Sequence, residues 1–182
     1  MTNGGAAKGR QVPVRQAKLG LIADTHDNVQ ALDAALAIFR ERGVGCVVHA
    51  GDVTTSVTLA RLKGWHAIVA LGNNDADEGM VHAARQAGIE LMEVWEGWLS
   101  GLRVAVVHGH DHRRLAEAVG SGRFDLVVTG HTHRLRNEVV GHTRVLNPGA
   151  LHRAARYTCV IYDTAKDAVQ IFDVPKPVRS NR

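Results

Sequence analysis

Five times along this chain, a short apolar segment typical of a buried strand leads directly into a cluster of Asp, Asn or His residues. The apolar segments span residues 18–23, 44–50, 66–71, 102–108 and 126–129. In open α/β sheets, ligands bind beyond the carboxyl ends of the strands. We therefore expect all five polar clusters to converge on one edge of a sheet.

The first half of the chain alternates strands with helices. Residues 29–42 repeat apolar side chains at helical spacing and end at Gly43, a favoured C-terminal residue of helices. Further helices are expected at 54–63, 77–87 and 111–119. Alternation of strand and helix predicts a parallel sheet with right-handed crossovers.

The second half reads instead as a series of hairpins. Strands at 91–98 and 102–108 flank Ser100-Gly101, and two more hairpins are expected within 138–146 and 157–174. The chain therefore starts parallel and ends mostly antiparallel. Its 182 residues suit one α/β domain, placed at 17–175 between a flexible leader (1–16) and a basic tail (176–182).

Composition narrows the choice of partner. Lys and Arg number 22 against 18 for Asp and Glu, a net charge of +4 that suits an anionic small molecule but is too weak to indicate nucleic acid. No apolar run approaches the roughly 20 residues that span a bilayer, and the leader lacks the apolar core of a secretory signal. Cys46 and Cys159 lie in apolar runs, which favours buried thiols over a disulfide or zinc pair. We expect a cytoplasmic protein without a membrane partner, and a homo-oligomer is one option.

The polar clusters supply oxygen and imidazole nitrogen but no sulfur. Their donors are Asp24, His26, Asp52, Asn73, Asp75, His108, His110, His131 and His133. Mixed oxygen and imidazole ligands suit Mn, Fe, Zn, Co or Ni better than Ca. The donors are too many for one closed tetrahedral site, so they favour two divalent ions sharing a carboxylate. Two such ions with two carboxylates leave about two positive charges, which would attract a phosphate.

Each cluster alone also has an ordinary explanation. Asp52 could cap a helix starting at Thr54, and residues 73–75 could form a plain turn. A His-x-His pair could be a surface pair. Their occurrence in order, each at the end of an expected strand, favours the metal centre.

The ordered set resembles the calcineurin-like metallophosphoesterase superfamily, in particular its small single-domain phosphodiesterase branch. The matching motifs are Asp24-Thr25-His26, Gly51-Asp52, Gly72-Asn73-Asn74-Asp75, His108-Gly109-His110, Gly130-His131-Thr132-His133 and Asn147-Pro148-Gly149. The resemblance covers residues 18–163 and implies a four-layer α/β/β/α sandwich with two packed mixed sheets.

The resemblance also implies a ligand set and a reaction. One ion would be bound by Asp24, His26 and His133, the other by Asn73, His108 and His131, with Asp52 bridging both. Manganese is the first choice, with Fe, Zn, Ni or Co as alternatives. A metal-bridging hydroxide would attack the phosphorus of a small phosphate ester, most readily a phosphodiester, which makes the chain a metal-dependent phosphoric ester hydrolase.

One position departs from the pattern. Many relatives carry a His after the ligand Asn to protonate the leaving group, but here that residue is Asn74. Asp75 or His110 could protonate the leaving group instead. Asn74, Asp75 and His110 are therefore the candidate catalytic residues. Without a strong acid, activated diesters should be favoured over alkyl monoesters. The alternatives are a protein-binding scaffold resembling the retromer subunit of this fold, or a phosphomonoesterase or nucleotide pyrophosphatase.

Overall fold

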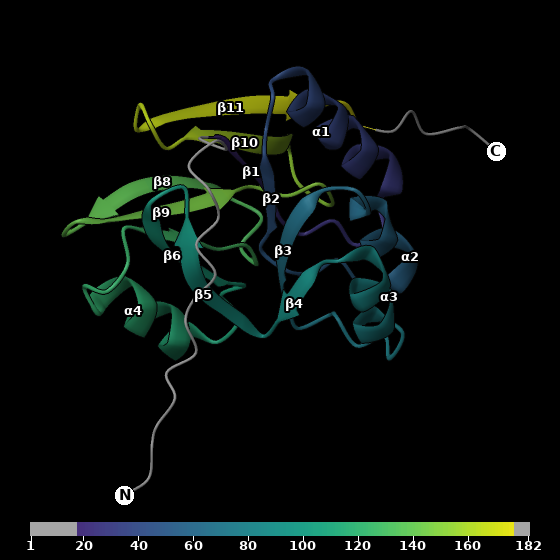
Figure 1. Cartoon of the computed structure of the whole chain (residues 1–182), viewed down its shortest axis with the longest axis horizontal. Helices are drawn as coiled ribbons and strands as arrows, with labels where there is room; N and C mark the ends of the chain where they lie inside the picture. Colours follow the sequence, from purple (N-terminus) through teal and green to yellow (C-terminus); the bar gives the residue numbers. More distant parts are fainter. Residues whose placement is uncertain (1–17, 177–182) are drawn as a thin grey trace, which may run out of the picture.

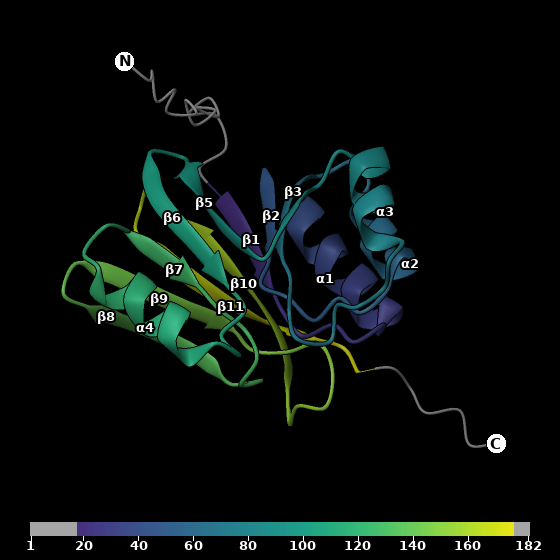
Figure 2. The ribbon, with the colours of Figure 1, turned by 90° about the horizontal axis from the view of Figure 1, so that it is seen from below.

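The structure is a computed structural model that describes residues 18–176, so the expected leader and the tail beyond Lys176 lie outside the described residues. Two mixed sheets pack face to face, and helices cover both outer faces (Figures 1 and 2). This arrangement is the expected four-layer α/β/β/α sandwich.

The first sheet has six strands in the order β11-β10-β1-β2-β3-β4. Its strands are β1 (Lys18–Ile22), β2 (Cys46–His49), β3 (His66–Ala70), β4 (Glu90–Met92), β10 (Tyr157–Asp163) and β11 (Ala168–Val174). Strands β1 to β4 run parallel, whereas β10 pairs antiparallel with β1 and β11. The carboxyl ends of β1, β2 and β3 therefore meet at one edge.

The second sheet has five strands in the order β5-β6-β7-β9-β8. They are β5 (Val94–Leu99), β6 (Leu102–Val107), β7 (Leu126–Val128), β8 (Leu135–Val140) and β9 (Thr143–Pro148). The inner strands β6, β7 and β9 are parallel, and the two edge strands are antiparallel to their neighbours.

The helices form the two outer layers. On the first sheet lie α1 (Val29–Glu41), α2 (Ser56–Leu59), its 3₁₀ continuation η1 (Ala60–Leu62) and α3 (Met80–Ala87), and on the second lies α4 (His112–Gly120) (Figure 2). The Asn28 side chain caps α1 by accepting the Ala31 N–H, and Asp111 caps α4.

Side chains of the central strands alternate between the two faces of the first sheet, and both faces are covered. In β2, Val47 packs against the helix layer and Val48 packs between the two sheets. In β3, Val69 likewise faces the helices and Ile68 faces the other sheet. Because successive strand residues point to opposite faces, a strand covered on both faces reads as one continuous apolar run. Cys46 and Cys159 are buried free thiols, as expected. Within residues 18–176, no helix combines the length and apolarity needed to cross a bilayer.

Three predicted elements need correction. The single strand at 91–98 is wrong, because the chain leaves the first sheet after β4 and enters the second as β5, with Glu93 between them. The helix expected from residue 77 begins at Met80, since Asp77 instead accepts the backbone N–H groups of Ser56 and Gly79. The strand expected from residue 138 begins three residues earlier, at Leu135.

Candidate metal centre

Backbone hydrogen bonds tie the polar loops to one another. The N–H groups of Asp24 and His26 donate to the carbonyls of Gly51 and Asp52, each at 2.9 Å, which joins the loops after β1 and β2. The N–H of His131, in the loop after β7, donates to the Asp24 carboxylate at 3.0 and 3.1 Å. The structure therefore brings the polar ends of strands from both sheets to one edge, where the sequence predicts a metal centre.

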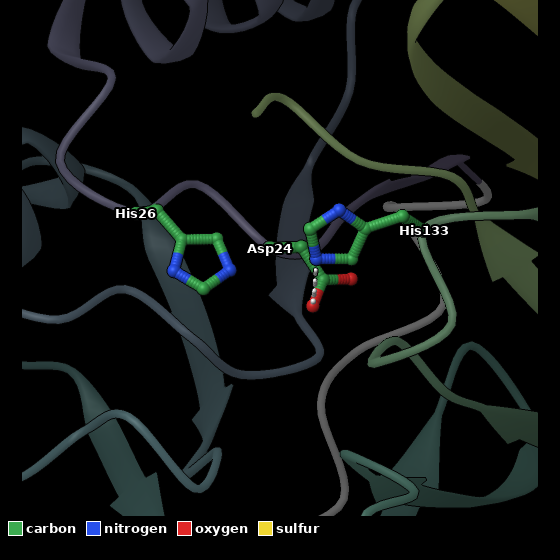
Figure 3. Close-up of side chains that lie close together, drawn as sticks. All are labelled: Asp24, His26 and His133. Atoms are coloured by element: carbon green, nitrogen blue, oxygen red, sulfur yellow. Dashed lines mark ion pairs between the residues drawn. The ribbon is translucent and has the colours of Figure 1, made fainter. Parts of the chain in front are cut away.

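One group of potential ligands consists of Asp24, His26 and His133. Their ligand atoms all lie within 4.8 Å of one another, and Nε2 of His133 is 3.4 Å from Oδ1 of Asp24. Asp24 is fully buried, whereas the two histidines are partly exposed, and the dashed line in Figure 3 marks the ion pair of His133 with Asp24. Two of the three potential ligands in this group are therefore accessible to solvent in part.

A second group consists of Asp24, Asp52 and His108, all buried and again within 4.8 Å of one another. Oδ2 of Asp52 lies 3.4 Å from Nε2 of His108 and 3.4 Å from Nε2 of His26. Asp24 belongs to both groups, and Asp52 contacts a histidine of each. Two carboxylates thus lie where two neighbouring ions could share them.

Two of these histidines fit a metal ion particularly well. Nε2 of His26 and Nε2 of His108 are buried, and neither has a hydrogen-bond partner within the described part of the chain. A buried polar atom without a partner is costly and rare in native proteins. The other ring nitrogen of His108, Nδ1, lies 2.7 Å from the Ala50 carbonyl, which leaves Nε2 as the donor to a metal.

The pKa values of the Asp24 and Asp52 carboxyl groups are shifted in opposite directions. Burial raises the pKa of Asp24 to about 7, and the neighbouring Asp52 adds to the increase. Burial also opposes ionisation of Asp52, but His108 and two hydrogen bonds from Asn74 outweigh it and hold the pKa of Asp52 well below its usual range. Binding of a cation would therefore release a proton from Asp24 near neutral pH.

The backbone is strained at most of the expected ligands. Five of them have positive φ angles between 43° and 67°: Asp24, His26, Asp52, His131 and His133. Non-glycine residues rarely adopt this conformation, and such strain clusters at functional sites.

Three of the remaining predicted site residues, His110, His131 and Asn74, contact or adjoin members of these groups. The His131 ring centroid is 5.2 Å from that of His108, and the exposed His110 ring is 5.5 Å from the same ring. Asn73 is exposed in the loop after β3. The side-chain amide of Asn74 donates to Oδ2 of Asp52 at 2.9 Å.

Asp75 is engaged by backbone groups. Its carboxylate accepts the N–H groups of Asp52, Thr54 and Gly72 at 2.9, 2.6 and 2.7 Å. These contacts tie the loop after β3 to the loop that carries Asp52. The geometry is that of a residue that holds the loops in place.

Sequence reasoning missed His49. This buried side chain ends β2, with Nε2 2.7 Å from Oγ1 of Thr25, and its Nδ1 accepts the Gly51 N–H at 3.2 Å. His152 was also missed, and its ring centroid is 5.2 Å from that of His26. A histidine inside an otherwise apolar strand segment is the signal that could have revealed His49.

A family model described as the calcineurin-like phosphoesterase superfamily domain matches residues 18–167. The chain belongs to this superfamily. It is 29% identical over 165 residues to phosphodiesterase MJ0936 of Methanocaldococcus jannaschii, covering 87% of this chain and 94% of that protein.

Solved structures agree with this assignment. One described as a novel archaeal phosphodiesterase superposes with a TM-score of 0.81 at 27% identity, covering 86% of this chain and 99% of the other. Vps29 of Entamoeba histolytica, solved in complex with zinc, gives 0.59 at 20% identity and covers 86% and 98%, a likeness of fold alone.

Proposed function

We propose that this protein is a phosphodiesterase that depends on two divalent metal ions, with manganese the first choice. The observation that carries the proposal is the pair of adjacent Asp and His groups that share Asp24 at one edge of the sandwich. The similarity to MJ0936, which is named a phosphodiesterase, supports the same reaction class.

The side chains of this site would bind the ions and fix their positions. Asp24, His26 and His133 would hold one ion. Asn73, His108 and His131 would hold the other, and Asp52 would contact both. When bound, the ions would lower the pKa of a shared water and neutralise the phosphoryl oxygens. Asn74 orients Asp52 through two hydrogen bonds, so its amide acts on a ligand rather than on the substrate.

The candidate general acids are poorly suited to protonate a leaving group, so we expect activated diesters to be hydrolysed fastest. Both Asp75 oxygens already accept backbone N–H groups, and Asn74 carries no ionisable proton. His110 is exposed beside His108 and is the candidate best able to reach a leaving oxygen. A single exposed imidazole is a modest general acid, so good leaving groups should react fastest.

Metal-titrated hydrolysis of bis(p-nitrophenyl) phosphate and p-nitrophenyl phosphate tests the proposal. We expect manganese to stimulate turnover, the diester to be preferred, and Asp52→Asn to reduce turnover by about 100-fold or more. Asp33→Asn, which changes an aspartate paired with Arg61 on the surface, is the matched control. Absence of metal-stimulated turnover of both esters would favour a protein-binding scaffold instead.

A further inference from the structure

A cavity of about 380 Å³ adjoins the candidate metal centre. It lies between the end of β3, the link from β4 to β5, the end of β6 and the start of α4. Gly72 and His108 line this cavity and also belong to the loops of the metal centre. A group attached to a phosphate at the metals could therefore extend into it.

The cavity has an apolar wall. Leu71 ends the β3 segment, while Val94 and Val107 are direct partners in the antiparallel pair of β5 and β6. Val107 is buried, and Leu71 and Val94 are partly exposed. Ligand cavities typically combine such apolar walls with a few polar groups.

The one guanidinium that lines the cavity is already paired with carboxylates. Nη1 of Arg114 lies 3.1 Å from Oε2 of Glu93, and its Nε lies 3.3 Å from Oδ2 of Asp111. Asp75 adds a third carboxylate to the lining. Besides His108 and His110, the lining therefore holds three carboxylates and one guanidinium, a balance that should disfavour a second anionic group.

We propose that this cavity binds one uncharged organic substituent of the substrate, of about nucleoside size, while the phosphate lies at the metal centre. The inference rests on the proposed function, because it assumes that a phosphate ester occupies the metals. A cavity of this volume is much larger than a methyl or ethyl group requires. The substrate class is therefore an ester of phosphate with a bulky, uncharged alcohol rather than a pyrophosphate.

Calorimetric binding of monophosphates to the manganese-loaded full chain tests the cavity without requiring turnover. The probes are thymidine 5′-monophosphate, methyl phosphate and thymidine 5′-diphosphate. We expect thymidine 5′-monophosphate to bind about tenfold more tightly than methyl phosphate, the ratio for about 50 Å² of apolar surface removed from water. The second phosphate of the diphosphate should bring no gain in affinity over the monophosphate.

Val94→Phe should fill the cavity and abolish the preference for the thymidine ester, while methyl phosphate binds within about twofold of wild type. Val139→Phe, at a 58% exposed position on β8, is the matched control and should change neither affinity. Equal binding of the two monoesters to wild type would overturn the proposal, as would equal weakening of both by Val94→Phe.

A second variant separates blocking from misfolding. Val94→Cys can be folded first and then alkylated with N-ethylmaleimide, because Cys46 and Cys159 are buried. Alkylation should remove the thymidine preference that the unmodified variant retains, and an unchanged preference would contradict the assignment. If the thymidine preference is present but bis(p-nitrophenyl) phosphate is not hydrolysed with any metal, the proposed function fails and the cavity assignment stands.

Discussion

Nε2 of His49 lies 2.7 Å from Oγ1 of Thr25, and this buried contact joins the end of β2 to the loop after β1, which carries Asp24 and His26. Because Nδ1 of the same ring accepts the Gly51 N–H, the ring proton is on Nε2, which donates to Thr25. Burial lowers the pKa of His49 to about 3, so the ring is neutral near pH 7. His49 is thereby hydrogen-bonded both to Thr25, which follows Asp24, and to Gly51, which precedes Asp52.

Replacing His49 should weaken metal binding although the residue is not a ligand. We expect His49→Ala to lower manganese affinity by about 10–100-fold, the usual loss when a residue supporting the ligands is removed. Titration of metal-free protein with manganese measures this affinity. His82→Ala, at an exposed position of α3, should leave it unchanged. Equal manganese affinity in His49→Ala and His82→Ala would contradict the supporting role of His49.

Gly72 is required because the Asp52 loop approaches it closely. A Cβ at this position would clash with the carboxylate and the backbone nitrogen of Asp52. Gly72→Ala should therefore displace Asp52 and reduce both turnover and metal affinity at least about tenfold. Gly120→Ala is the control, since a Cβ there meets no other atom and alanine favours the helix by up to about 1 kcal/mol. Normal metal affinity in Gly72→Ala would contradict the role of this close approach.

Asp24 should give the metal-free protein an unusual pH dependence. Its pKa is raised to about 7 in the folded protein against 3.8 for an ordinary Asp, so the folded state binds more protons between these values. The stabilising contribution is complete below pH 3.8 and is lost as the pH rises through 7. Asp24→Asn should therefore raise thermal stability more at pH 8 than at pH 4, by at most about 4 kcal/mol. An equal effect at both pH values, measured by thermal unfolding with EDTA, would argue against the raised pKa.

His110 and Asp75 should affect catalysis differently. His110→Asn should slow diesters with alkyl leaving groups by up to about 100-fold and p-nitrophenyl esters much less, because only poor leaving groups need a proton. Asp75→Asn should slow both substrates alike and lower the free energy of unfolding by about 1–3 kcal/mol, since an NH₂ group replaces one of the two oxygens that accept three backbone N–H groups. Comparison of kcat for the two leaving groups checks both. An unchanged ratio in His110→Asn would exclude it as the acid.

The sequence predicts the strands and the convergence of polar loops because both follow from local patterns. Apart from His49, the segment 44–50 has no polar side chain, which indicates burial on both faces, and Gly51-Asp52 follows it. The division into two sheets is less accessible, because the chain changes sheet at Glu93 without a turn signal. His49 was missed for a related reason, since its function depends on Thr25, 24 residues away.

The ligand geometry adds what chain order cannot provide. The order of motifs indicates which residues approach the site, but it does not reveal that Asp24 belongs to both potential metal groups. Nor does it reveal that Asp75 is saturated by backbone donors, because these contacts depend on the loop conformations. Strain at residues such as His26 and His131 is likewise a property of the folded backbone.

The metal content of the purified chain tests the central claim most directly. Protein stripped with EDTA, reloaded with manganese and freed of excess metal should retain about two ions per chain when measured by elemental mass spectrometry. Asp24→Asn, which alters a carboxylate ligand of one ion, should retain no more than about one ion, while Asp33→Asn should match the wild type. Wild-type protein that retains no manganese, or an Asp24→Asn variant that retains as much as the wild type, would contradict the proposed centre.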